Sequence, residues 1–130
     1  MRTILTTVVG AASLLTLVQG WSHHSFSAEF DIARPVEFTG TVTRVEWTNP
    51  HAWLFLDVGA NGDVENWAVE LLGINNLMRR GLTANSIKPG DVLTVEGFGA
   101  RDGTRTANAS VVIKTSTGEE IWASAAGDRN

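Results

Sequence analysis

Polar and apolar residues alternate along most of this chain with the period of two that is typical of half-buried β-strands. Alternation begins at 25–32, where Phe26, Ala28, Phe30 and Ile32 occupy the apolar positions. We expect a strand there that ends at Pro35, because proline cannot donate to a strand ladder. Further strands are predicted at 36–47, 51–58, 64–72, 92–97, 104–114 and, less regularly, 119–123.

The period changes at residues 73–80, which carry Ile74, Leu77 and Met78 at helical spacing before Gly81, a typical helix stop. Three strands, a helix and two or more strands is the order of an OB-type barrel. We therefore predict an all-β, mainly antiparallel fold: a small OB-like β-barrel with one short helix between the third and fourth barrel strands. A two-sheet sandwich is the alternative, although it has no helix at that point.

The start of the chain indicates a secretory leader. Arg2 is followed by an apolar run at 4–18 that is too short for a typical membrane span. The small-residue rule allows a cut after Gly20 or after Ser22, so we expect a signal peptide at 1–22. A single domain at 23–123 and a disordered tail at 124–130 follow. The protein is then periplasmic or secreted, without a stable membrane anchor after cleavage; an uncleaved anchor is the alternative.

Composition excludes some function classes. The formal net charge is −4, there are no cysteines, and the lysines are Lys88 and Lys114. A protein that follows nucleic-acid phosphates needs a basic face, so no nucleic-acid partner is expected. Without cysteine, no disulfide stabilises the fold.

The three histidines carry the candidate chemistry. His23 and His24 lie at the predicted cut site, and His51 follows Asn49-Pro50. Imidazoles, together with a free α-amine, are nitrogen ligands that suit Cu(II) or Zn(II). A cut after Gly20 starts the mature chain at Trp21-Ser22-His23, a square-planar four-nitrogen set for Cu(II) or Ni(II), whereas a cut after Ser22 makes His23 the first residue. Solvated histidines without metal are the alternative.

Carboxylates and tryptophans add two further candidate groups. Glu46 and Glu70 could orient imidazole N–H groups, although strand alternation favours solvent-facing positions for both. Trp47, Trp53 and Trp67 fall on consecutive predicted strands and could line a ligand groove; packing in the core or on a sheet face is the alternative, and the one we favour.

Two segments resemble a known bacterial secreted family. They are His23-His24-Ser25-Phe26 with its continuation to Asp31, and the run from Gly40 to Asn49-Pro50-His51. Both are similar to the hallmark segments of the domain-of-unknown-function family 6152, and the similarity spans nearly the whole mature chain. The resemblance implies a periplasmic β-barrel domain and assigns no activity.

Two functions from different classes follow as hypotheses. The first is a periplasmic metal-binding module, with copper as the ion, that uses His23, His24 and His51 to carry or buffer the metal. The second is a metal-free OB module that binds a periplasmic protein partner or small ligand through a face bearing Trp47, Trp53 and Trp67. An enzyme is the least favoured class, because no paired catalytic residues are visible.

Overall fold

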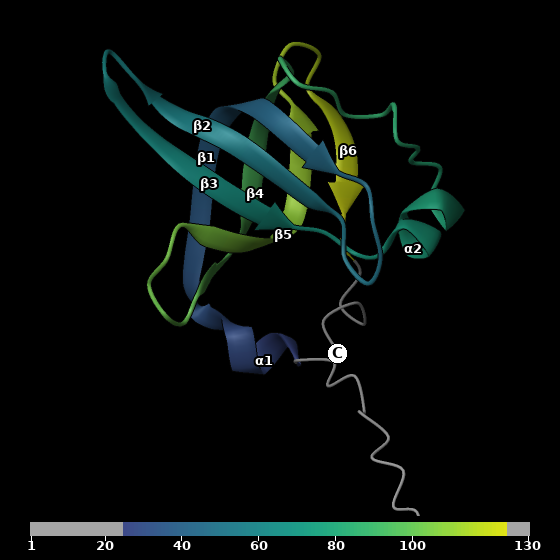
Figure 1. Ribbon diagram of the computed structural model, residues 1–130, viewed down its shortest axis with the longest axis horizontal. Coiled ribbons are helices and arrows are strands. Elements are labelled where there is room, and N and C mark those ends of the chain that lie inside the picture. Colours follow the sequence, from purple (N-terminus) through teal and green to yellow (C-terminus); the bar gives the residue numbers. More distant parts are fainter. Residues whose placement is uncertain (1–24, 125–130) are drawn as a thin grey trace, which may run out of the picture.

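The computed structural model describes residues 25–124 of the 130-residue chain. The predicted leader, His23, His24 and nearly all of the predicted tail lie outside the described residues. Along the described chain, a short helix precedes three consecutive strands, and a second short helix precedes the remaining strands (Figure 1). Their bounds are α1 Phe26–Glu29, β1 Phe30–Glu46, β2 Trp53–Ala60, β3 Asp63–Glu70, α2 Ile74–Arg79, β4 Val92–Ala100, β5 Thr106–Lys114 and β6 Glu119–Ala123.

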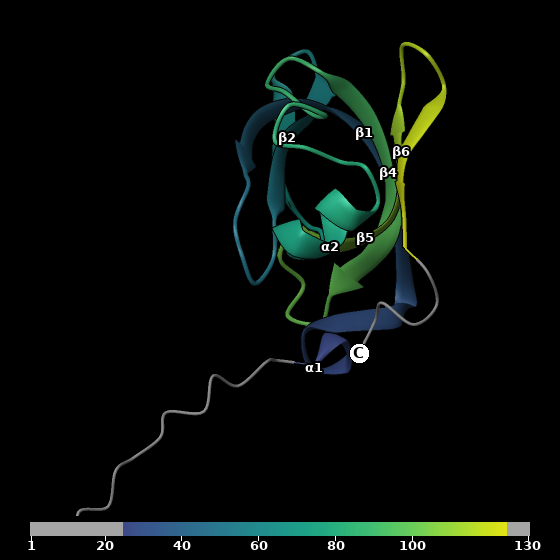
Figure 2. The same cartoon turned by 90° about the vertical axis from the view of Figure 1, so that its right-hand side faces the viewer.

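The strands form a mostly antiparallel sheet in the order β3-β2-β1-β4-β5-β6. One further pairing, between β3 and the first half of β5, is parallel and runs from Ala68↔Thr106 to Glu70↔Asn108. The pairings therefore form a closed circuit: each of β1, β2, β3, β5 and β4 pairs with the next strand in this order, and β4 pairs with β1. β6 lies outside this circuit and pairs with the second half of β5 (Figure 2). The prediction of an all-β, mainly antiparallel fold is confirmed.

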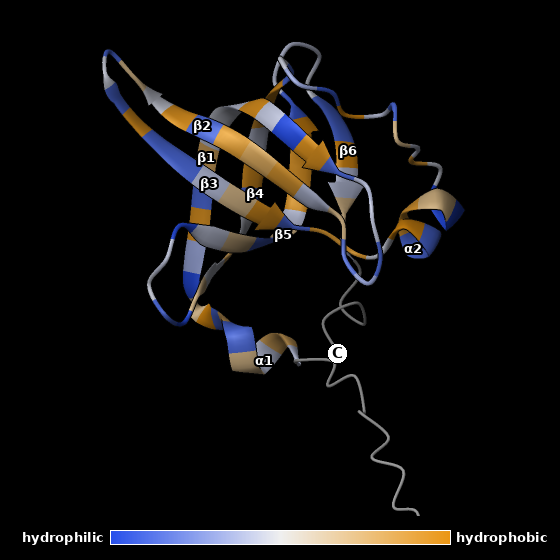
Figure 3. Ribbon diagram, in the orientation of Figure 1, coloured by the Kyte–Doolittle hydropathy of each residue, from blue (hydrophilic) through white to orange (hydrophobic). Residues whose placement is uncertain are grey.

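Alternation along the strands separates the core from the outer surface, as the hydropathy colours in Figure 3 show. Leu54 and Leu56 on β2 are fully buried, and Leu54 lies opposite Val69 of β3. Burying a side chain of this size stabilises the fold by roughly 1.5–3 kcal/mol. The largest fully buried side chains are Leu54, Leu56, Leu77, Leu93, Val42, Val69, Val95 and Val112.

The N-terminal arm differs from its prediction. Residues 26–29 form α1 rather than a strand, and Ile32 is 68% exposed instead of facing the core. Pro35 does not end the strand either, because β1 continues through it to Glu46. At Pro35, β1 pairs with β4 on one side and has not yet met β2, whose pairing starts at Gly40. A residue without an N–H is tolerated where one side of the strand has no ladder.

The turns and the helix follow their sequence signals. Asn61 and Gly62 form the tight hairpin between β2 and β3, both with positive φ, as such two-residue turns require. α2 begins after Gly73 and ends at Arg79, and Gly81 has a φ of 86°. Leu77 of α2 is part of the hydrophobic core, and Ile74 of the same helix packs against it. The short helix between the third and fourth strands is therefore confirmed.

Candidate functional site

His51 lies two residues before the start of β2 and contacts a buried carboxylate. Its Nδ1 meets Oε1 of Glu70, the last residue of β3. The Glu70 side chain is 4% exposed and the His51 side chain 38% exposed. An ionised carboxylate can only accept a hydrogen bond, so this contact selects the tautomer with hydrogen on Nδ1 and the lone pair on Nε2.

Glu70 is buried although it belongs to the outer side of the sheet. It lies opposite Trp53 on β2 and opposite Asn108 on β5, and these residues alternate with the core positions Leu54 and Val69. Neighbouring strands thus flank Glu70 on both sides, and His51 contacts its carboxylate. The expectation that Glu70 faces solvent is wrong, because alternation predicts the face of a strand residue but not what covers that face.

The loop before β2 is held against the segment after β3. The Ala52 N–H donates to the Leu72 carbonyl at 3.1 Å, and the Leu71 N–H donates to the Ala52 carbonyl at 2.9 Å. At Gly73 an added Cβ would lie 2.3 Å from the Pro50 carbonyl oxygen, so this close approach requires glycine. The backbone on both sides of His51 is therefore fixed relative to the end of β3.

Glu46 is on the same outer row as Glu70 but on the far side of Trp53. Its register partner on β2 is Trp53, whose other partner is Glu70. The Glu46 carboxylate contacts the Arg44 guanidinium, which also lies 3.7 Å from the centroid of the Phe55 ring. Of the two predicted carboxylates, the structure brings Glu70 to His51 and gives Glu46 an arginine partner.

The structure does not bring the three predicted tryptophans to one face. Trp53 lies opposite Glu70, on the outer side of the sheet. Trp67 lies opposite the buried Leu56, on the inner side, and its ring packs against Phe38 with centroids 4.5 Å apart. Trp47 packs against the hydrophobic core just after β1. Trp47 and Trp67 therefore have packing roles. Trp53 is the tryptophan beside the His51–Glu70 pair.

A groove that the sequence did not indicate runs along Trp53. Its walls come from α1, the start of β2 and the loop between β4 and β5, and include Ala28, Glu29, Trp53, Arg101, Asp102 and Thr106. The Asp102 carboxylate accepts hydrogen bonds from the Thr104 N–H at 2.9 Å and from its hydroxyl at 2.7 Å. These bonds hold the pKa of Asp102 below its usual value. No sequence signal identified this groove, because its three walls are far apart along the chain.

Within residues 25–124, there is no group of three or more His, Cys, Asp or Glu side chains that could hold a metal ion. His51 with Glu70 is a pair, and His23 and His24, the other two predicted ligands, lie outside the described part of the chain. None of the helices within 25–124 has the length and apolar character needed to cross a membrane.

Comparison with known proteins gives one family. The model of a family of unknown function, DUF6152, matches residues 12–109. This range includes β1, β2, β3, α2 and β4, together with His51 and Glu70. Curated proteins give no match. The family predicted from the His-His-Ser-Phe and Asn-Pro-His segments is thus confirmed, and the chain belongs to the DUF6152 family.

Proposed function

We propose that this protein is an exported metal-binding module, with copper as the preferred ion, in which His51 supplies one imidazole ligand and the N-terminal histidines supply the others. The observation that carries the proposal is the contact between His51 Nδ1 and the buried Glu70 carboxylate. Histidines that bind metals almost always donate their second ring N–H to a carboxylate, a carbonyl or water. The pair has this arrangement.

Glu70 prepares His51 for this role in two ways. It fixes the ring orientation, and it selects the tautomer whose Nε2 carries the lone pair that a metal needs. Burial of Glu70 also keeps the carboxylate from being an exposed, mobile competitor for the ion. His51, at 38% exposure, is open enough to solvent for an ion to approach from outside.

The N-terminal arm supports the choice of the remaining ligands. The described chain starts at Ser25, directly after His24, and α1 lines the same groove as Trp53. α1, which follows the N-terminal histidines in sequence, therefore lies beside Trp53, the register partner of Glu70. Nitrogen-rich sets of this kind, with or without the free α-amine, suit the tetragonal geometry of Cu(II). The module carries or buffers the ion, and no reaction is assigned to it.

The circuit of strand pairings supports an OB-type barrel as the scaffold. β1, β2, β3, β5 and β4 succeed one another around the circuit, and α2 lies in sequence between β3 and β4. A closed ring of strands leaves few exposed edges and forms a rigid support for a site on its outer surface. The leader at 1–22 directs the protein to the periplasm or the medium in this proposal.

A ligand or protein partner bound through tryptophans is the alternative function. It is less well supported, because Trp53 and Trp67 lie on opposite sides of the sheet. Trp53 alone remains available for such a role, and the experiment below includes it.

Cu(II) titration of the purified exported protein, followed by electron paramagnetic resonance, tests the proposal. The wild type is expected to bind one equivalent with nitrogen hyperfine structure, and His51→Ala should lose a nitrogen ligand and affinity. Trp53→Ala is expected to bind copper like the wild type. Binding should also weaken as the pH falls through the ordinary imidazole range near ~6.5, because protons compete for the ligands. A wild-type spectrum of the aqueous ion alone would overturn the proposal.

A further inference from the structure

Trp53 differs from the other tryptophans of residues 25–124 in what surrounds its indole ring. Trp122 is part of the hydrophobic core, Trp47 packs against that core, and the Trp67 ring packs against Phe38. Within the described residues, Trp53 belongs to neither group, and its indole N–H donates no hydrogen bond. A tryptophan that combines an apolar ring with a polar N–H is typical of binding surfaces. Trp53 therefore offers a ring face and a donor to a ligand.

This ring is one wall of the groove described above, which has a volume of about 360 Å³. Small-molecule sites typically have volumes of about 300–1,000 Å³. The other walls are α1, with Ala28 and Glu29, and the loop between β4 and β5, with Arg101 and Asp102. The groove is open to solvent, so a chain-like ligand can extend beyond its ends.

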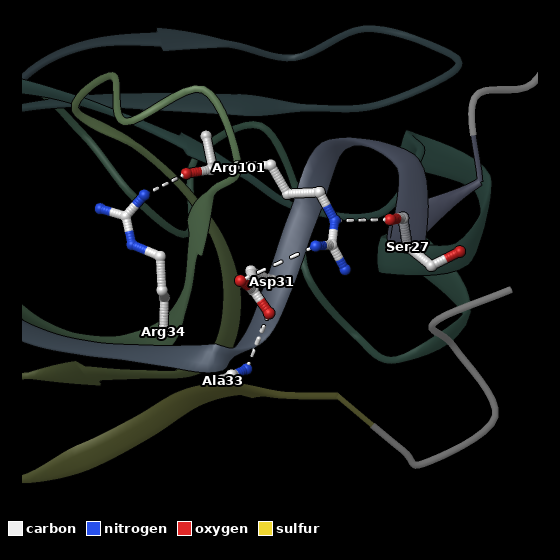
Figure 4. Close-up of polar contacts among 6 residues, drawn as sticks. Ser27, Asp31, Ala33, Arg34 and Arg101 are labelled. Carbon is white, nitrogen blue, oxygen red and sulfur yellow. Dashed lines mark hydrogen bonds and ion pairs between the residues drawn. The ribbon is translucent and has the colours of Figure 1, made fainter.

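Hydrogen bonds fix the walls of the groove relative to one another. The Arg101 backbone N–H donates to the Glu29 carbonyl at 2.9 Å, and Arg101 Nε donates to the Ser27 carbonyl at 2.8 Å (Figure 4). These two bonds join the loop to α1. Within the loop, the Asp102 carboxylate accepts hydrogen bonds from Thr104. The groove is thus formed before a ligand arrives, which lowers the entropic cost of binding.

A cationic donor and an anionic acceptor beside the groove both keep unused hydrogen-bonding capacity. The Arg101 side chain is 50% exposed, and it contacts Ser27 through Nε and Asp31 through Nη1. Its Nη2 therefore has no hydrogen bond or ion pair among residues 25–124. Asp102 accepts both bonds from Thr104 at Oδ1, and these bonds lower the pKa of its carboxyl group. The ionised carboxylate acts only as an acceptor.

The charges of the lining side chains disfavour ligands with several charges of one sign. Glu29 and Asp102 line the groove together with Arg101. An anionic ligand would meet two carboxylates, and a cationic ligand would meet the guanidinium; bringing like charges together costs binding free energy. A neutral ligand with hydroxyl groups avoids this cost, because each hydroxyl can accept from the guanidinium or donate to a carboxylate.

We propose that this groove binds a neutral saccharide chain, with one pyranose ring lying on the indole of Trp53. A pyranose with equatorial hydroxyls carries its polar groups around the ring edge and its C–H groups on the two ring faces. The oxygen atoms make these C–H groups partly positive, so the negative face of the indole attracts them. The hydroxyls at the ring edge bind Arg101 and Asp102. This function is separate from the copper site and does not rest on it.

An NMR titration of the purified exported protein without metal tests the inference. The probe is cellotetraose, a neutral chain of pyranose rings whose substituents are all equatorial. It is expected to shift the Trp53 indole N–H signal and the Asp102 and Thr104 amide signals until the site is saturated. The tetramers of glucosamine and of glucuronic acid with the same linkage carry opposite charges. Both are expected to bind at least about tenfold more weakly than cellotetraose.

Variants of the outer face of β2 test the role of the indole ring. Trp53→Ala removes the surface on which the sugar lies, so the affinity for cellotetraose should fall about tenfold or more. Trp53→Phe keeps a smaller aromatic face and should lose less, and it serves as the second variant if the alanine protein does not fold. Phe55→Ala is the matched control, because Phe55 is the next outer-face aromatic on β2 and lies beside Arg44 rather than along the groove. It should bind like the wild type.

Asp102→Asn tests how the groove selects against charge. The substitution removes one negative charge from the lining. We therefore expect the variant to bind the glucuronic acid tetramer more tightly than the wild type does, while cellotetraose loses a charge-assisted hydrogen bond and binds more weakly. Unchanged affinities for both tetramers would contradict a role of Asp102 in the site.

The remaining outcomes decide the inference as a whole. If millimolar cellotetraose gives no saturable shifts in the wild type, the groove is not a saccharide site. Binding that is unchanged in Trp53→Ala, or shifts confined to residues away from the groove, would equally overturn the inference. Tighter binding of either charged tetramer would show that the groove selects a cation or an anion instead. None of these measurements uses copper, so they leave the proposed metal function as it stands.

Discussion

Glu70 and His51 are in direct contact although one ends β3 and the other precedes β2. The carboxylate is almost completely buried and the imidazole is partly open to solvent. Burying a carboxylate without a hydrogen-bond partner costs free energy of folding, and His51 gives Glu70 such a partner. Glu70 in turn holds the orientation of the His51 ring. This mutual dependence is what the following variants measure.

Replacing Glu70 with glutamine should weaken copper binding without large changes in shape. Glu70→Gln keeps the side-chain volume but removes the ionised acceptor that orients His51. Removing such a partner typically lowers metal affinity by about 10–100-fold. Glu46→Gln is the matched control, because Glu46 lies on the same outer row and contacts Arg44 instead. Equal affinities of the two variants in a copper titration would contradict the role of Glu70.

The His51–Glu70 contact should also be measurable as a coupling in stability. His51→Ala leaves a buried carboxylate with one partner fewer, which costs about 1–3 kcal/mol of unfolding free energy. In the double variant with Glu70→Gln this cost should be smaller, with a coupling of about 0.5–3 kcal/mol. Urea unfolding followed by tryptophan fluorescence gives the four free energies. If the two single effects simply add, the contact contributes nothing to folding.

Gly73 is expected to be essential for the position of the loop that carries His51. In Gly73→Ala the new Cβ would meet the Pro50 carbonyl and must displace the loop, at a cost of about 1–3 kcal/mol. Copper affinity should fall as well, because His51 follows Pro50 directly. Gly99→Ala is the control: its Cβ would make an ordinary contact of 3.5 Å with Val36. A Gly73→Ala protein as stable as Gly99→Ala would show that the loop adapts freely.

Asp102 should contribute to stability in a pH-dependent way. Hydrogen bonds from the Thr104 backbone and then its hydroxyl hold the pKa of Asp102 below the usual value. The ionised form is thus favoured in the folded state, so its contribution is present above the unfolded pKa of about 3.9 and is lost as the pH falls through the folded pKa. Asp102→Asn should flatten this acidic part of the stability curve.

The measurement is unfolding free energy against pH, together with the carboxyl titration of Asp102 by NMR. Thr104→Val removes the hydroxyl and keeps the backbone donor, so its effect should be smaller than that of Asp102→Asn. An Asp102 carboxyl that titrates at or above the usual value would contradict the prediction.

Local patterns in the sequence were sufficient for much of the fold. Alternation identified the strands from β1 to β6, because one face of each strand packs on a core while the other meets solvent. The spacing of Ile74, Leu77 and Met78 with Gly81 identified α2. These features depend on residues a few positions apart, and a sequence records such relationships directly.

The same rules failed where distant residues decide the outcome. Pro35 was expected to end a strand, but a proline is excluded only where both sides of a strand are paired, and the sheet leaves one side of β1 open there. Residues 26–29 alternate like a strand, yet the arm forms α1, which Arg101 contacts from 74 residues along the chain.

For the candidate site, the sequence by itself determined which side chains are available: His51, the two N-terminal histidines, Glu46 and Glu70. Only the tertiary structure decided that Glu70 rather than Glu46 reaches His51, and that Trp53 faces away from Trp67. The physical reason is that register and strand order set which side chains become neighbours, and both are properties of the whole sheet rather than of any one segment.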